Sequence, residues 1–355
     1  MYFTIDLRVL FLYNCIINTE RSVDMDKYCV ACPRECSVRR DTGELGYCLC
    51  NERAHLTRVS LHRWEEPPVS GQNGSGTLFF SGCSLRCVFC QNRDISRAQK
   101  GRAFSVGELA EAMLALQAAG AHNVNLVTPT HYLSSVVKAL EKAKPSLRIP
   151  VVYNCGGYEK VSSLERLDGL VDIYLPDCKY FSSELSARYS SAANYFEVAS
   201  KALIEMYRQV EKATFAPYRG GCSGASGAPD LTSTSQNEAD GDLIIKGLII
   251  RHLILPGCRR DSIELLSRVS ELLPIESVRL SLMRQFTPDF VNKEKFPELC
   301  RKLTSFEYNS VLSHAEKLGF VGYTQSAEAA SSEYTPDFCT EEAFELLTNS
   351  KSERS

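Results

Sequence analysis

The chain has 355 residues, a hydrophobic fraction of 44% and a formal net charge of −3. This length and hydrophobic content allow one large α/β core with a small additional segment. Lysine and arginine form no surplus and no long run, which argues against nucleic acid and against a membrane as partners. Most of the 15 cysteines lie in the first hundred residues and not at disulfide-scaffold spacings. This clustering indicates metal chemistry in a reducing compartment, so we expect a cytoplasmic protein.

The first 27 residues are expected to form an extension without fixed structure. Their apolar run from Val9 to Ile17 is interrupted by Asn14. The run is too short to span a bilayer and lacks the basic region of a signal peptide, so we expect a soluble protein. An alternative is that translation starts at Met25, just before the first cysteine motif.

Alternating apolar runs and helical stretches follow Cys50, and this alternation predicts a parallel α/β sheet or barrel. The predicted strands are rich in Val, Ile, Leu and Phe, as strands buried on both faces are. They span residues 77–80, 123–127, 150–153, 171–175, 248–255 and 278–283.

Two helices have recognisable ends. Ser105 with Glu108 predicts a capping box for a helix that ends at Gly120. Thr304 with Glu307 repeats the pattern for a helix that ends at Gly319.

We expect four segments along the chain. They are the extension 1–27, a cysteine-rich metal-binding segment 28–60, a barrel domain 61–325 and a C-terminal tail 326–355. Residues 219–242 are rich in Gly, Ser and Thr, and they predict a flexible surface insertion within the barrel domain.

Cys83, Cys87 and Cys90 follow the first predicted strand with the spacing C-x3-C-x2-C. Active sites of α/β barrels lie at this end of a strand. Three thiolates can hold three corners of an iron–sulfur cluster, whereas an ordinary electron-transfer cluster needs four, and the next cysteine is the distant Cys155. One iron would then keep an open coordination position. The alternative is a zinc site or a group of buried thiols, but structural zinc also needs four ligands.

Most of the chain after residue 28 resembles the radical S-adenosylmethionine (SAM) enzymes. It is most similar to homologues of pyruvate formate-lyase activating enzyme, of the PflX-like branch. The phrases that carry the resemblance are LHRWEEPPVSG (61–71), GSGTLFFSGCSLRCVFCQNRDIS (74–96), NLVTPTHY (125–132), VVYNCGGYE (151–159), VDIYLPDCKY (171–180), GLIIRHLILPG (247–257) and LSLMRQFTP (280–288). The resemblance implies a partial (β/α)6 TIM-like barrel. It also implies a 4Fe-4S cluster on Cys83, Cys87 and Cys90 that cleaves SAM to a 5′-deoxyadenosyl radical.

The resemblance also implies SAM-binding residues. Phe89 occupies the position of an aromatic residue that contacts adenine, with core packing as the alternative. Thr128 and Thr130 lie where related enzymes carry a Gly-Gly-Glu segment that meets the SAM amino group, but no acid is present here.

Further polar residues lie next to apolar strand ends. The resemblance implies that they contact the ribose and carboxylate of SAM, whereas a buried salt bridge is the alternative. These residues are Asn154, Asp177, Lys179 and Arg251. His252 and Gln285 are either structural or ligand-binding.

A second cysteine set comprises Cys29, Cys32, Cys36 and Cys48. Four thiolates suit zinc or an auxiliary iron–sulfur cluster, and Cys50 is an alternative to Cys48 as the fourth ligand. Free cysteines are the remaining interpretation. Buried packing or substrate contact are the alternatives for Cys155 and Cys178.

The expected activity is reductive SAM cleavage followed by hydrogen abstraction, with SAM and an external electron donor as partners. By resemblance the substrate is the backbone glycine of a glycyl radical enzyme; another peptide, a nucleoside or a small molecule is the alternative. A different class is a non-catalytic iron–sulfur electron-transfer protein, which would need a fourth protein ligand on the cluster.

Overall fold

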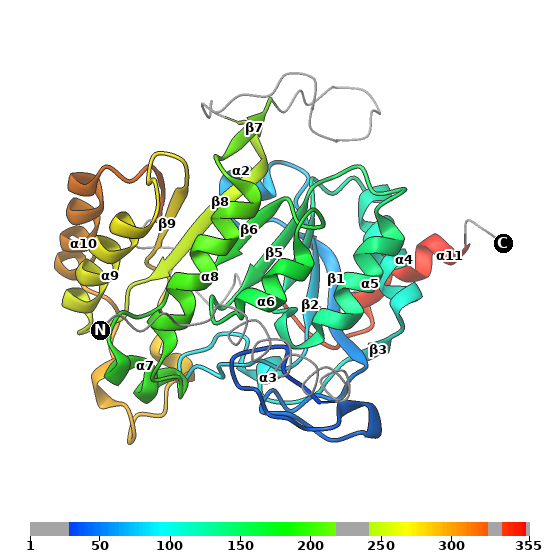
Figure 1. Cartoon of the computed structure of the whole chain (residues 1–355), viewed down its shortest axis with the longest axis horizontal. Coiled ribbons are helices and arrows are strands. Elements are labelled where there is room, and N and C mark those ends of the chain that lie inside the picture. The colour runs from blue at the N-terminus through cyan, green and yellow to red at the C-terminus, as the bar shows by residue number, and fades with distance from the viewer. Residues whose placement is uncertain (1–27, 218–240, 326–335, 353–355) are drawn as a thin grey trace, which may run out of the picture.

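The computed structural model of the chain describes residues 28–217, 241–325 and 336–352 (Figure 1). The predicted extension over residues 1–27 lies outside these ranges, as do residues 218–240, which include most of the predicted insertion. No helix within the described ranges is long and apolar enough to cross a membrane.

A ten-stranded sheet forms the centre of the described structure, with the strand order β10-β9-β8-β6-β5-β4-β2-β1-β3 and with β7 paired to β8. Neighbouring strands from β2 to β10 are parallel, and β1, β3 and β7 pair antiparallel. The strands are β1 (Ala54–His62), β2 (Ser75–Phe80), β3 (Arg102–Phe104), β4 (Val124–Val127), β5 (Val151–Cys155), β6 (Ile173–Pro176), β7 (Thr214–Ala216), β8 (Leu243–Leu253), β9 (Arg279–Met283) and β10 (Gly322–Thr324).

The six predicted strands correspond to β2, β4, β5, β6, β8 and β9, so the prediction of a mostly parallel α/β fold is confirmed. Every residue of β2, β5, β6 and β9 is buried, which explains why these segments read as continuous apolar runs.

Helices connect the strands and cover the sheet (Figure 1). The α-helices are α2 (Pro67–Ser70), α3 (Arg93–Ser96), α4 (Val106–Ala118), α5 (Leu133–Ala143), α6 (Val161–Leu164), α7 (Ser183–Ser190), α8 (Tyr195–Val210), α9 (Arg259–Leu272), α10 (Ser305–Leu318) and α11 (Glu345–Ser352). Short 3₁₀ helices span Arg40–Thr42, Thr130–Tyr132, Glu165–Leu167, Pro288–Phe290, Pro297–Leu299 and Glu342–Phe344.

Both predicted capping boxes are present. The Ser105 hydroxyl accepts from the Glu108 backbone N–H at 3.2 Å, and the Glu108 carboxylate accepts from the Ser105 N–H at 2.8 Å. Thr304 and Glu307 make the same pair of bonds at the start of α10, which ends at Gly319 with φ of 89°. A residue with φ in this region is usually glycine, because a side chain would clash with the backbone.

Residues 336–352, within the predicted C-terminal tail, pack against the sheet. The Phe338 ring meets the Phe79 ring of β2 edge to face at 5.3 Å, and the Phe344 ring lies 6.1 Å from that of Phe104 in β3. Helix α11 also contacts α4 and β1. This part of the predicted tail therefore covers the antiparallel end of the sheet.

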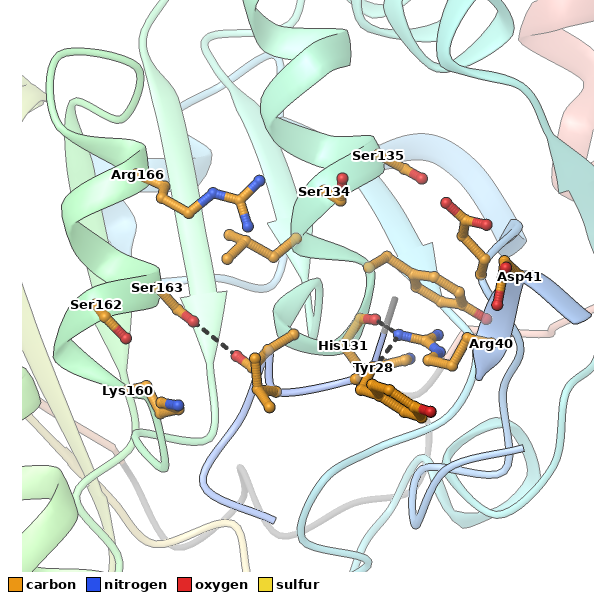
Figure 2. Close-up of a pocket in the computed structure, with 16 residues that line it drawn as sticks. Tyr28, Arg40, Asp41, His131, Ser134, Ser135, Lys160, Ser162, Ser163 and Arg166 are labelled. Atoms are coloured by element: carbon orange, nitrogen blue, oxygen red, sulfur yellow. Dashed lines mark hydrogen bonds between the residues drawn. The ribbon is translucent and has the colours of Figure 1, made fainter. Parts of the chain in front are cut away.

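The cysteine-rich segment lies beside the carboxyl ends of the parallel strands, next to α3 (Figure 1). A pocket of about 400 Å³ separates part of this segment from α5 and α6 (Figure 2). Two hydrogen bonds next to the pocket connect the segment to the sheet domain. Ser163 donates to the Ala31 carbonyl at 2.9 Å, and Arg40 donates to the His131 carbonyl. The segment is thus attached directly to the sheet domain.

Candidate active site

The loop after β2 carries the three cysteines of the C-x3-C-x2-C motif. Gly82 begins this loop with φ of +85°, and a Cβ atom there would lie 2.3 Å from the Cys50 sulfur, so only glycine fits. All three cysteines are free thiols; Cys87 is buried, and Cys83 and Cys90 are half-buried. Burial, together with the nearby thiols of Cys87 and Cys90, raises the pKa of Cys83 to about 12. The three thiols are therefore close enough to interact electrostatically.

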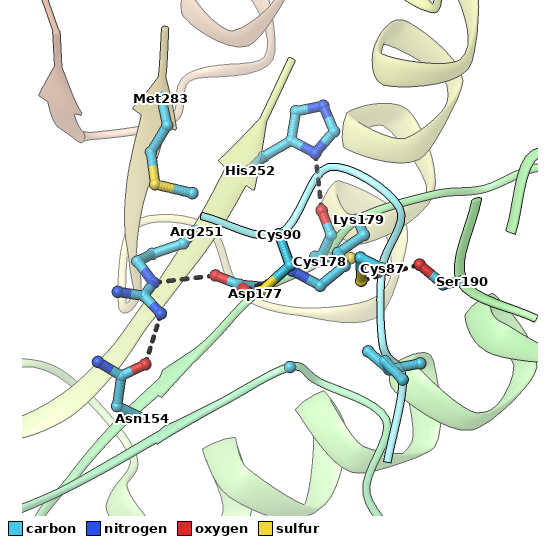
Figure 3. A network of polar contacts seen from close by, with 12 residues as sticks. Cys87, Cys90, Asn154, Asp177, Cys178, Lys179, Ser190, Arg251, His252 and Met283 are labelled. Carbon is cyan, nitrogen blue, oxygen red and sulfur yellow. Dashed lines mark hydrogen bonds and ion pairs between the residues drawn. The ribbon is translucent and has the colours of Figure 1, made fainter. Parts of the chain in front are cut away.

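Hydrogen bonds hold the cysteine sulfur atoms in place. Ser190 at the end of α7 donates to the Cys87 sulfur at 2.9 Å (Figure 3), and its hydroxyl also bonds to that of Tyr180 at 2.8 Å. The Leu85 N–H donates to the Cys83 sulfur at 3.3 Å. Donors of this kind stabilise thiolates, the ligand form of cysteine.

A cavity of about 230 Å³ lies between this loop and the carboxyl ends of the strands. Cys87 and Cys90 line the cavity. Five of the residues predicted to bind SAM line it as well, namely Phe89, Asn154, Asp177, Lys179 and Arg251. The structure thus brings together polar side chains from the ends of three strands, β5, β6 and β8, and the cysteine loop.

The Arg251 guanidinium organises the polar floor of the cavity (Figure 3). Its Nε donates to Asp177 at 3.0 Å, one terminal nitrogen donates to Glu65 at 3.3 Å, and the other donates to the amide oxygen of Asn154. Lys179 forms an ion pair with the second oxygen of Asp177. The buried salt bridge proposed as an alternative role is therefore present, and it faces the cavity.

The charges of this network are set by burial and by their neighbours. Burial opposes ionisation of Asp177, but Lys179 and Arg251 hold the pKa of its carboxyl below its usual value. Burial raises the pKa of Glu65, although Arg251 counteracts the shift. The pKa of Lys179 is raised: burial lowers it, but Asp177 and Cys87 outweigh that effect. The cavity therefore presents both cationic and anionic groups.

Phe89 lies between two of the cysteines and is 7% exposed. Its ring packs edge to face against Tyr180 at 6.5 Å and Phe286 at 6.3 Å. It lines the cavity while it packs in the core, so the two roles considered for it are compatible.

Residues 77–214 match the model of the Radical SAM superfamily. This part of the chain is thus similar to that superfamily. The uncharacterized protein MJ0674 of Methanocaldococcus jannaschii is 28% identical over 316 residues, which cover 85% of this chain and 78% of that protein. Among solved structures, methylornithine synthase (PylB) is similar over 73% of this chain and 72% of its own, with 14% identity and a TM-score of 0.42. A radical SAM methyltransferase from Sphaerobacter thermophilus is similar over 73% and 69%, with 11% identity and a TM-score of 0.43.

The three thiols on the loop after β2 fit an iron–sulfur cluster by their chemistry, because thiolates are its usual protein ligands. Throughout the described ranges, no three His, Cys, Asp or Glu side chains are arranged closely enough to hold a single metal ion. In a 4Fe-4S cluster each cysteine binds a different iron, so the three sulfur atoms need not meet at one point.

Thr128 and Thr130 follow β4 but do not line the cavity. Thr128 has φ of +60°, which is rare for a β-branched residue, and its N–H donates to the Asn154 carbonyl at 2.8 Å. The Thr130 hydroxyl donates to the buried Glu159 carboxylate at 2.7 Å. Their contact with SAM stays a prediction.

Of the remaining sequence candidates, one lines the cavity and three do not. His252 donates from Nδ1 to the Cys178 carbonyl at 2.7 Å, and burial lowers its pKa to about 4 (Figure 3). Gln285 lines the cavity and accepts from the Gln325 amide at 3.1 Å. Cys155 and Cys178 are buried in the main core cluster and are absent from the cavity wall.

Glu65 is a site residue that the sequence analysis quoted without assigning a role. It is half-buried, and it accepts from Asn125 at 3.0 Å and from Asn154 and Arg251 at 3.3 Å. The available signal was the pair Glu65-Glu66 directly before two prolines, because adjacent acids in a buried strand-to-helix connection need cationic partners. Trp64 also lines the cavity, although 63% of it is exposed.

Proposed function

We propose that this protein is a radical SAM enzyme whose 4Fe-4S cluster is held by Cys83, Cys87 and Cys90. Such a cluster supplies an electron that cleaves SAM to methionine and a 5′-deoxyadenosyl radical, which then abstracts a hydrogen atom from a substrate. The observation that carries the proposal is the placement of Cys87 and Cys90 in the wall of a cavity lined by charged side chains from successive strand ends.

The chain's own residues would bind and orient SAM in this cavity. SAM carries a carboxylate, an ammonium group and a sulfonium, so it requires both cationic and anionic neighbours. Lys179 and Arg251 supply positive charge, and Asp177 and Glu65 supply negative charge. Phe89 offers an apolar ring face for the adenine.

For the substrate we propose the backbone glycine of a glycyl radical enzyme. This finer assignment rests on the similarity of the seven sequence phrases to activating enzymes. Trp64 at the exposed side of the cavity offers a contact surface for a macromolecular substrate. Another peptide or a small molecule is the alternative outcome.

SAM binding at the cluster is tested by electron paramagnetic resonance of the anaerobic, dithionite-reduced protein. We expect SAM to change the spectrum of the wild type and to change it much less in Lys179→Ala. Lys201→Ala is the matched control, because Lys201 lies in an exposed ion pair with Glu197 on α8. An unchanged wild-type spectrum would indicate a non-catalytic electron-transfer protein.

The substrate assignment has its own test. Incubation of the reduced protein with SAM and a glycyl radical enzyme is expected to produce the doublet signal of a glycyl radical. SAM cleavage without this signal in any such enzyme would retain the radical SAM activity and contradict the glycyl assignment.

A further inference from the structure

Four thiols outside the active site gather in the cysteine-rich segment. The sulfur atoms of Cys36 and Cys48 both lie 3.6 Å from the point where a Cβ of Gly46 would stand. The Ser37 N–H donates to the Cys29 carbonyl at 3.1 Å and the Glu35 N–H donates to the Cys32 carbonyl at 3.0 Å, so the residues on either side of Cys36 contact both of these cysteines. The Tyr47 N–H donates to the Cys36 sulfur at 3.1 Å, a bond that favours the thiolate. The four cysteines are therefore neighbours in space as well as in sequence.

The segment over residues 28–52 has no apolar core. Its buried residues are Cys32, Gly46, Cys48 and Cys50, and its regular structure is one 3₁₀ turn, Arg40–Thr42. All of its cysteines are free thiols. Neither apolar burial nor a disulfide thus accounts for the order of this segment, whereas metal binding can supply such folding free energy.

The segment also touches the cluster loop directly. The Cys50 sulfur lies 3.4 Å from the Ser81 carbonyl and against Gly82. Arg34 donates to the Ser84 carbonyl at 2.8 Å and to the Ser190 carbonyl at 3.0 Å. Ser190 also bonds to the Cys87 sulfur. Arg34 therefore connects this segment to the cysteine loop at Ser84 and to the residue that holds the Cys87 sulfur.

On its other side the segment is attached to the helices that follow β4 and β5. Figure 2 shows Arg40 at the rim of the pocket, where it bonds to the His131 carbonyl. Its other guanidinium nitrogens donate to the carbonyls of Cys50 and Asn51. The position of the four thiols relative to the barrel is thus fixed from two directions.

We propose that Cys29, Cys32, Cys36 and Cys48 form a second metal site, which binds a thiophilic centre and orders the segment against the cluster loop. The centre is either a zinc ion or an iron–sulfur cluster, since four thiolates serve both. No three of these thiols stand at metal-ligand positions in the described ranges, so binding must draw them together and is coupled to folding of the segment.

Metal analysis of the anaerobically purified protein tests this site. We expect about one zinc per chain, or ~4 irons beyond those of the first cluster. Cys29→Ser/Cys32→Ser should lose this metal, and Cys339→Ser, which changes an exposed cysteine, should retain it. Wild-type protein with no metal beyond the first cluster would overturn the proposal, as would full retention of the second metal in the double variant.

A measurement on the wild type covers the case in which the double variant does not fold. X-ray absorption at the zinc edge, or iron analysis in a Cys83→Ala/Cys87→Ala/Cys90→Ala background, reports the second centre directly. Four sulfur neighbours around zinc, or iron that remains without the first cluster, support the site. Zinc with nitrogen or oxygen neighbours, or no remaining iron and no zinc, contradicts it. Neither result depends on SAM cleavage, so this inference and the proposed function can fail separately.

Discussion

Arg251 shares its guanidinium group among Asn154, which is buried, and the half-buried Asp177 and Glu65. Replacement by alanine leaves the half-buried Glu65 without its cation and removes one of the two cations at Asp177. We predict that Arg251→Ala lowers the free energy of unfolding by about 3–5 kcal/mol. Denaturant unfolding under anaerobic conditions measures this loss.

The matched control for this prediction is Arg268→Ala. Arg268 lies on α9 with an exposed guanidinium that pairs with Glu264 and Glu271. Exposed pairs contribute little, so the change is expected to stay within about 0.5 kcal/mol. Equal losses in the two variants would show that the Arg251 network does not stabilise the protein as argued.

Glu159 is buried and accepts hydrogen bonds from the hydroxyl groups of Thr130 and Tyr153. Burial raises its pKa from an ordinary value of 4.5 to about 7, although the Thr130 hydroxyl counteracts the shift. Because the folded pKa lies above the unfolded one, its contribution to stability is complete below the unfolded pKa. That contribution is lost as the pH rises through the folded pKa.

We therefore predict that wild-type stability falls by up to about 3 kcal/mol between pH 4.5 and neutral pH because of this group. Glu159→Gln should remove that part of the pH dependence, and Glu197→Gln, at an exposed position, should not. Unfolding free energies measured across this pH range decide the matter. Parallel curves for wild type and Glu159→Gln would be the contrary result.

The sequence indicated the polar partners of Arg251 in the cavity, except Glu65, but not the way they pair. Each of Asn154, Asp177, Lys179 and Arg251 is a polar residue at an apolar strand end, and strand ends of a parallel sheet meet at one edge. The role of Glu65 was not predicted, because Glu65 lies 186 residues from Arg251 in the chain and a pairing over that distance leaves no local pattern in the sequence. The orientation of Thr130 toward Glu159 is likewise a tertiary feature.

Strands β7 and β8 form an antiparallel pair in which Ala216 lies opposite Leu243. Residues 217–242 thus connect two adjacent strand ends. We predict that deletion of residues 220–239 leaves cluster content and unfolding free energy close to unchanged, because the remaining residues suffice for a hairpin connection and loop-closure entropy varies slowly with length.

Phe215→Ala provides the contrast within the same element. Phe215 is fully buried in β7, so its truncation should cost about 3–5 kcal/mol. Thermal unfolding and iron content of both variants test the prediction. A deletion variant as unstable as Phe215→Ala would mean that the connection contributes to the fold.

Element prediction succeeded where the pattern was long or capped. The six long apolar runs and the boxes at Ser105 and Thr304 were all correct. The three-residue strands β3, β7 and β10 carry no periodic signal of their own. Strand β1 was missed because it pairs antiparallel at the boundary between the cysteine-rich segment and the barrel.

Both ends of the described chain meet the parallel sheet around the site. Arg34 of the cysteine-rich segment bonds to the loop that carries the cysteines, and Pro336 near the C-terminus lines the cavity. The N-terminal segment and the residues near Pro336 thus both lie beside the site. The central claim is that this structure serves SAM cleavage at the cysteine triplet.

The direct test is the amount of 5′-deoxyadenosine formed under anaerobic conditions from SAM and dithionite. The account predicts turnover by the wild type and by Cys339→Ala. It also predicts loss of both turnover and iron–sulfur absorbance in each of Cys83→Ala, Cys87→Ala and Cys90→Ala, because two thiolates do not retain the cluster. Wild-type turnover in any of these three variants, or none in the cluster-loaded wild type, would contradict the account.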